Sequence, residues 1–220
     1  MITLSLNEIR EHSPCKSGWE KLLKSKPNAN WNEQFPLSDI IDSNGLNDAL
    51  WCLRARPEHS KLWRKYAVWC ARQVEHLMTD GRSKAALEVA WRHSEGVATD
   101  QELAAARDAA RHGARHGAGY GAWDAVTNAA WDAAWSAWLA AGDTARAAWV
   151  ALAAAYAADA AGYAAWDAAR DAARDARDAA WEAPWNAAWD AAGAANAAWD
   201  AALAAQEKKL REILQAGEWR

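Results

Sequence analysis

The stretch TDQELAAARDAARHGARHG, residues 99–117, opens the part of the chain on which the fold depends. Its first residues match a capping box, in which Thr99 accepts a hydrogen bond from a backbone amide and Glu102 reaches back to the Thr99 amide. A helix is therefore predicted to begin here. From Gln101 to Ala205, Ala makes up 49 of 105 residues. Because Ala loses no side-chain entropy in a helix, this part is predicted to be helical wherever nothing interrupts it.

Glycine and proline mark the predicted helix ends within this Ala-rich part. Four Gly residues between positions 113 and 121 loosen one connection, and Gly142-Asp143 combines a C-cap with an N-cap. Pro184 is expected to open or kink a helix. Three or four long helices are therefore predicted between residues 99 and 216.

Tryptophan supplies the apolar area that Ala lacks, since the chain carries 17 Trp residues and each ring can bury about 150 to 250 Å². Two sets lie at helical spacing, namely Trp131, Trp135 and Trp138, and Trp181, Trp185 and Trp189. We interpret these stripes chiefly as core between antiparallel helices. For a few of the Trp rings, we keep the alternative interpretation that they belong to a binding face.

Residues 1–98 have ordinary composition and are predicted to form an N-terminal region of short helices. A turn is expected at residues 43–45, between a helix capped by Ser38 and a second short helix. A longer helix is expected from Ser60, and another from Ser83 to about Gly96.

The predicted fold class is all-α, a bundle of short N-terminal helices joined to long Ala- and Trp-rich antiparallel helices. The predicted division is an N-terminal region, residues 1–98, and an Ala/Trp-rich region, residues 99–220, within one continuous domain.

Composition limits the classes of protein that fit. The longest apolar run, Ala147 to Ala158, has 12 residues, too few to span a bilayer, and the N-terminus lacks the features of a secretory signal. We therefore expect a cytoplasmic protein. Because the net charge is -4 at pH 7, we expect no direct nucleic-acid binding through phosphate contacts. Cys15, Cys52 and Cys70 lack metal-ligand spacing, and we expect all three to be buried free thiols.

Two charged patterns in the sequence are candidate sites. His112 and His116 have the spacing of a metal-binding pair, but no third ligand is evident, so the pair is interpreted as part of a basic surface. The second pattern alternates acids and bases along one predicted helix: Asp167, Arg170, Asp171, Arg174, Asp175, Arg177 and Asp178. Such a stripe is typical of a self-contained salt-bridged face, and its alternative is a charged contact surface for a partner. We take these seven residues as the candidate partner-binding residues, and expect no catalytic residue, metal or cofactor.

Three segments carry a resemblance to a known family: SPCKSGW at residues 13–19, PLSDIID at residues 36–42 and DALWCLR at residues 48–54. Together with KAALEVAWRHSEGVATDQELAAARDAA at residues 84–110 and the Ala-rich tail, they resemble the bacterial immunity proteins associated with polymorphic toxin systems. The resemblance implies a small cytoplasmic protein that neutralises a toxin effector by binding it. It implies no particular set of functional residues.

The function expected from the sequence is therefore non-enzymatic, inhibitory protein binding through an exposed face of the Ala-rich helices. One alternative is a phage or mobile-element anti-defence protein, for example an anti-CRISPR-type inhibitor, that binds a bacterial immune complex. Another is a self-associating structural protein with Trp residues in the seam, since a homo-oligomer is possible. A helical enzyme or ligand binder with a Trp-lined pocket is a further alternative.

Overall fold

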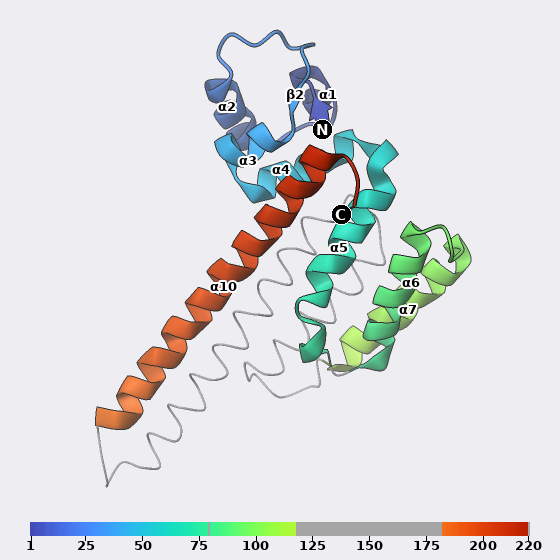
Figure 1. The fold of residues 1–220 in the computed structure, drawn as a ribbon, viewed down its shortest axis with the longest axis vertical. Coiled ribbons are helices and arrows are strands. Elements are labelled where there is room, and N and C mark those ends of the chain that lie inside the picture. Colours follow the sequence, from blue (N-terminus) through green and yellow to red (C-terminus); the bar gives the residue numbers. More distant parts are fainter. Residues whose placement is uncertain (79, 118–181, 220) are drawn as a thin grey trace.

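The computed structural model describes residues 1–78, 80–117 and 182–219, and in these ranges the protein is all-α with one small sheet (Figure 1). The N-terminal elements are β1 (Thr3–Leu4), α1 (Leu6–Glu11), α2 (Lys16–Ser25), β2 (Phe35–Pro36), α3 (Ser38–Asn44) and α4 (Leu46–Cys52). Next come the 3-10 turns η1 (Leu53–Ala55) and η2 (Pro57–His59), α5 (Ser60–Arg72), η3 (Glu75–Leu77), α6 (Gly81–Ser94), α7 (Asp100–Gly117) and α10 (Glu182–Ala216). The predicted fold class is confirmed.

The sheet was not predicted from the sequence. β1 and β2 pair antiparallel, with Leu4 opposite Phe35, and each strand has only two residues. Strands of this length show no alternation of polar and apolar residues, so they leave no sequence signal. The backbone amide of Ile2 continues the contact to the other end of the chain, because it donates to the Leu214 carbonyl at 2.7 Å.

The turn between α3 and α4 lies where it was predicted. Asn44 ends α3, and Gly45 follows with φ of 95°, a left-handed conformation that Gly adopts without steric cost. The predicted N-cap is wrong, because Ser38 is the first helical residue and Leu37 precedes it without a capping hydrogen bond. Leu37 is fully buried, and its packing fixes the start of α3.

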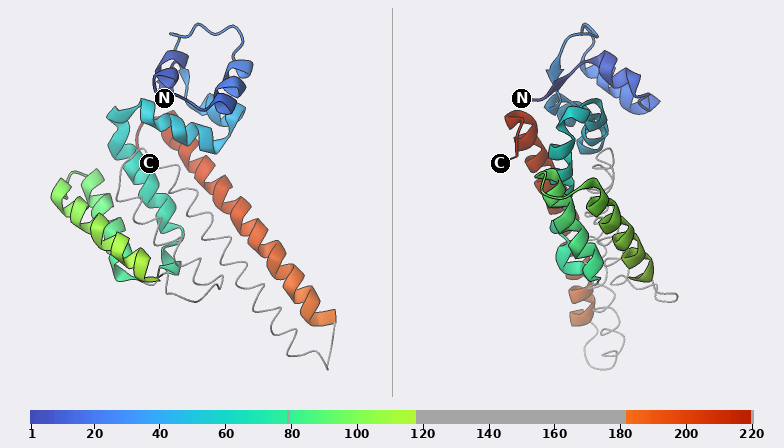
Figure 2. Two further views of the ribbon diagram at one scale, coloured as in Figure 1. Left: turned by 180° about the vertical axis from the view of Figure 1, so that it is seen from behind. Right: turned by 90° about the vertical axis from the view of Figure 1, so that its right-hand side faces the viewer.

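The helices between residues 60 and 117 follow the predicted pattern with shifted ends. α6 begins at Gly81, two residues earlier than expected, because the Asp80 side chain accepts from the Arg82 amide and caps the helix. The capping box before α7 is confirmed: the Thr99 amide donates to Glu102 at 2.7 Å, and the Glu102 amide donates to the Thr99 hydroxyl at 3.2 Å. The close-packed α6–α7 pair lies on one side of α5 (Figure 2).

The core joins the two ends of the chain. Leu210, Ile213 and Leu214, near the end of α10, are at most 1% exposed and belong to the same apolar cluster as the N-terminal helices. Buried Tyr66 of α5 donates its hydroxyl proton to the Gln206 carbonyl of α10 at 3.1 Å. The core therefore crosses the boundary predicted between residues 98 and 99.

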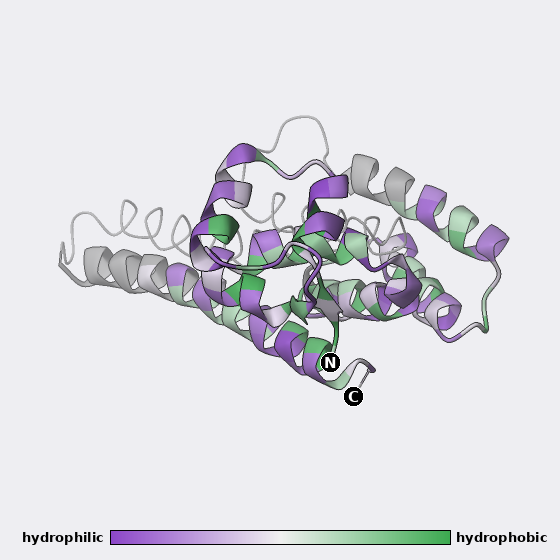
Figure 3. Cartoon of the chain, turned by 90° about the horizontal axis from the view of Figure 1, so that it is seen from above, coloured by the Kyte–Doolittle hydropathy of each residue, from purple (hydrophilic) through white to green (hydrophobic). Residues whose placement is uncertain are grey.

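α10 is long and reaches beyond this core. Its C-terminal part lies against α3 and α5, whereas its N-terminal part extends away from the other described helices (Figures 1 and 3). Pro184 lies in its first turn, as expected of a residue that opens a helix. In the part of the chain that the structure describes, no helix is both long and apolar enough to cross a bilayer.

Candidate functional site

The partner-binding residues predicted from the sequence lie outside the described residues. This applies to all seven members of the charged stripe, namely Asp167, Arg170, Asp171, Arg174, Asp175, Arg177 and Asp178. The side chains of His112 and His116, and those of the two Trp stripes, also lie outside the described part. These interpretations stay predictions.

A surface pocket of about 140 Å³ lies among α1, α2, α3 and α4, which cluster at the end of the molecule that carries the N-terminus (Figure 1). Its walls are mostly apolar and include Ile9, Trp19, Ile40 and Trp51. A concave, mainly apolar pocket with a few polar groups is the usual form of a small binding site. We call it the α2–α4 pocket.

The segments that carry the family resemblance supply most of this pocket. Residues 13–19 contribute four lining residues, residues 48–54 contribute three, and residues 36–42 contribute Ile40. These segments are separate in the sequence, and the packing of α2 on α3 and of α3 on α4 brings them together. The sequence alone does not place these segments at one site, because their positions along the chain do not show which helices pack side by side.

Gly18 allows α2 to approach the polar wall of the pocket. A Cβ atom added at Gly18 would lie 3.0 Å from Asp48 Oδ2 and 3.3 Å from Cys15 Sγ. Asn44 fixes this approach, since its side-chain amide donates to the Gly18 carbonyl at 2.8 Å and to Asp48 Oδ2 at 2.7 Å. The Asp48 carboxylate is thus held at the pocket wall by a neutral partner.

Cys15 is exposed, which corrects the prediction that all three thiols are buried. It precedes α2 instead of lying on the apolar face of that helix, so its side chain remains in solvent. Cys15 Sγ lies 3.6 Å from Ser17 Oγ, and hydrogen bonding by Ser17 is the main cause that lowers the pKa of the Cys15 thiol below 9.0. Cys52, on the same pocket, is buried, and desolvation raises its pKa to about 12.

Half-exposed aromatic rings surround the pocket. Trp19 and Trp51 line it, and the ring of Trp31, 37% exposed, packs edge-on against Trp19 with 5.7 Å between centroids. The Arg10 guanidinium lies 5.4 Å from the Trp31 ring centre, and that of Arg54 lies 4.2 Å from the Trp51 ring centre. One cation therefore lies over the ring of Trp31, and another lies over the ring of Trp51.

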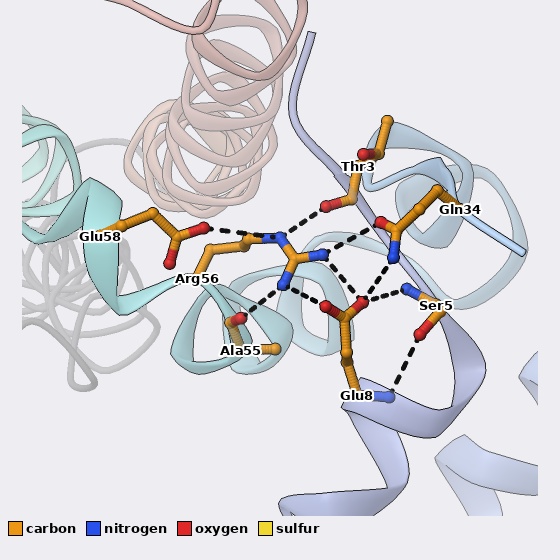
Figure 4. Close-up of polar contacts among 7 residues, drawn as sticks. All are labelled: Thr3, Ser5, Glu8, Gln34, Ala55, Arg56 and Glu58. Carbon is orange, nitrogen blue, oxygen red and sulfur yellow. Dashed lines mark hydrogen bonds and ion pairs between the residues drawn. The ribbon is translucent and has the colours of Figure 1, made fainter. Parts of the chain in front are cut away.

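An ion-pair network around Glu8 and Arg56 fixes the position of α1 (Figure 4). The Arg56 guanidinium donates to both carboxylate oxygens of Glu8 at 2.8 Å, and its Nε donates to the Thr3 carbonyl at 2.6 Å. The Ser5 amide and the Gln34 side chain also donate to Glu8. The bonds from Arg56 are the main cause that lowers the pKa of Glu8 from 4.5 to about 2. The network ties β1, α1 and the segment after η1 into one unit, and Ile9 of α1 forms a pocket wall.

The chemistry that this site offers is recognition through charge and aromatic surface. Cys15 is the exposed nucleophile of the described residues at the pocket, whereas burial keeps Cys52 protonated at neutral pH. Within the described ranges, His, Cys, Asp and Glu side chains form no group of three that could hold a metal ion.

A scan against protein-family models finds no match to this chain, and searches of the curated proteins and of the solved structures find no similar protein. The family resemblance therefore stays a prediction.

Proposed function

We propose that this protein is a non-enzymatic, immunity-like inhibitor that neutralises a toxin effector in the cytoplasm by direct binding. One observation carries the proposal: the separate segments that resemble immunity proteins converge on the α2–α4 pocket, and half-exposed Trp rings surround it. The contact surface proposed on this basis is the N-terminal pocket, in addition to the face of the Ala-rich helices expected from the sequence.

The composition of this surface supports a protein partner. Trp and Arg are the residues that contribute most often to binding energy at protein interfaces, and they act best beside pockets that exclude water. Trp31 and Arg10 form one such pair at the surface, and Trp51 and Arg54 form another. Both pairs are held by the fold before a partner arrives, so little side-chain entropy would be lost on binding.

The test is capture of a partner by the tagged chain from lysates of the native host and of the hosts of its phages. The variant Trp31→Ala removes an exposed ring without opening the core, and Val97→Ala is the matched control, since Val97 is 65% exposed and lies away from the pocket, between α6 and α7. We expect a toxin domain to be captured stoichiometrically by the wild type and by the Val97 variant, and more weakly by the Trp31 variant.

The purified chain must then inhibit the captured protein in an assay of the captured protein's activity. A defence-complex subunit in place of a toxin would replace the immunity role with the anti-defence role. Recovery of the bait alone, with multimers in light scattering, would contradict both and favour a self-associating structural protein.

A further inference from the structure

We propose that the α2–α4 pocket receives a basic side chain, a lysine or arginine of the protein partner, through Asp48 and the rings of Trp19 and Trp51. This inference rests on the proposed function, because it names the chemistry of the partner at that surface. It makes the pocket a recognition site for a cation that has an apolar stem.

Asp48 places a carboxylate at the pocket wall. The hydrogen-bond partner of this carboxylate among the described residues is the side-chain amide of Asn44, which donates to Oδ2 at 2.7 Å. No described Lys or Arg forms an ion pair with it. A carboxylate with a neutral partner in a mostly apolar site gains most from an incoming cation, because each charge-assisted hydrogen bond is about twice as strong as a neutral one.

The nearby cations of the chain are directed to other partners than the Asp48 carboxylate. Lys21 Nζ donates to the Asn44 backbone carbonyl at 3.1 Å and does not pair with the Asp48 carboxylate. The guanidinium of Arg54 packs on Trp51 and donates from Nε to the Trp51 carbonyl at 2.8 Å. The described lining of the pocket thus includes the Asp48 carboxylate and contains no Lys or Arg.

The walls of the pocket also fit a basic side chain. The indole rings of Trp19 and Trp51 and the other apolar walls match the methylene stem that Lys and Arg bury while the charged head meets a polar group. A volume of about 140 Å³ suits one side chain and not a folded segment. A neutral apolar group would fill the same walls but would desolvate Asp48 without compensation, which is unfavourable.

The experiment uses n-butylammonium as a probe of the lysine side chain and n-butanol as its neutral counterpart. Occupancy is read as protection of Cys15 from alkylation by iodoacetamide at constant ionic strength, because Cys15 lines the pocket and is the exposed thiol of the three. We expect saturable protection by n-butylammonium, and weaker protection by n-butanol at equal concentration.

Two variants of the full chain decide the role of Asp48. Asp48→Asn keeps the shape and removes the charge, and should weaken n-butylammonium binding by about fivefold or more. Asp200→Asn removes an exposed carboxylate of α10 and should change nothing. If Asp48→Asn does not fold, the comparison of ammonium with alcohol on the wild type decides alone.

Equal protection by the two probes, unchanged binding in the Asp48 variant, or no protection by either probe would each overturn the proposal. The proposed function is tested separately, by the capture experiment. If n-butylammonium binds as expected but no protein is captured from lysate, the cation pocket stands and the inhibitory role does not.

Discussion

Glu8 contributes to stability through a charge that is retained at unusually low pH. Arg56 is 13% exposed in its side chain and Glu8 is 34% exposed, so the pair is only partly screened by water. Replacing Glu8 with Gln should lower the free energy of unfolding by about 1 to 3 kcal/mol near neutral pH, because Arg56 loses its charged partner. Urea unfolding measures this change. Glu33→Gln, at an exposed carboxylate, is the control.

The lowered pKa of Glu8 also predicts how the free energy of unfolding changes at acidic pH. The pKa of Glu8 in the folded protein, about 2, lies below its ordinary value of 4.5. Its contribution is therefore fully present above 4.5, and is lost progressively as the pH falls from 4.5 towards 2. The difference in unfolding free energy between wild type and Glu8→Gln should shrink over that window. A difference that is constant with pH would show that the ion pair is not its origin.

The three thiols should differ in how fast they react with a thiol reagent. Cys15 is exposed with a lowered pKa, whereas burial raises the pKa of Cys52 and of Cys70 to about 12. A disulfide reagent such as DTNB should label one thiol of the native protein rapidly and all three only after denaturation. Cys15→Ser should abolish the rapid phase. Rapid labelling of two or three thiols in the native protein would contradict the burial of Cys52 in α4 and of Cys70 in α5.

At the scale of single elements, the capping box before α7 can be tested directly. Thr99 supplies both a hydroxyl acceptor and a backbone amide to its contact with Glu102. Thr99→Ala should cost about 1 kcal/mol of stability, the usual effect of losing an N-cap. Thr99→Ser keeps the hydroxyl and should be close to wild type in thermal or urea unfolding. Equal losses in the two variants would mean that the cap does not stabilise α7.

The elements also show what the sequence could predict and what it could not. The Thr99 cap and the turn at Gly45 depend on residues within a few positions, so they were predictable. The β1–β2 pair joins residues more than 30 positions apart, and the start of α3 depends on the burial of Leu37, so neither had a local signal. The pocket was not predictable for the same reason, because Cys15 and Asp48 come together only through the packing of α2 on α3 and of α3 on α4.

At the scale of the whole molecule, the end of α10 belongs to the N-terminal core. The Ile2 amide bonds to the Leu214 carbonyl, and Arg211 forms an ion pair with Asp42 of α3 at 2.7 Å. Trp219 packs edge-on against Trp91 of α6 with 5.5 Å between centroids. Residues that are far apart in the sequence therefore stabilise each other, and the ends of the chain should unfold together with the core.

A single substitution tests this coupling. Leu210 is fully buried, so Leu210→Ala removes apolar contacts that join α10 to the core and should cost about 2 to 5 kcal/mol. Lys208→Ala, two residues away and exposed, should stay within about 0.5 kcal/mol of wild type. The informative measurement is labelling of the Cys70 thiol at increasing urea concentrations, because this thiol is buried in α5 of the native protein. If α10 shares the core, Leu210→Ala will expose Cys70 at lower urea; if α10 unfolds on its own, the exposure of Cys70 will not move.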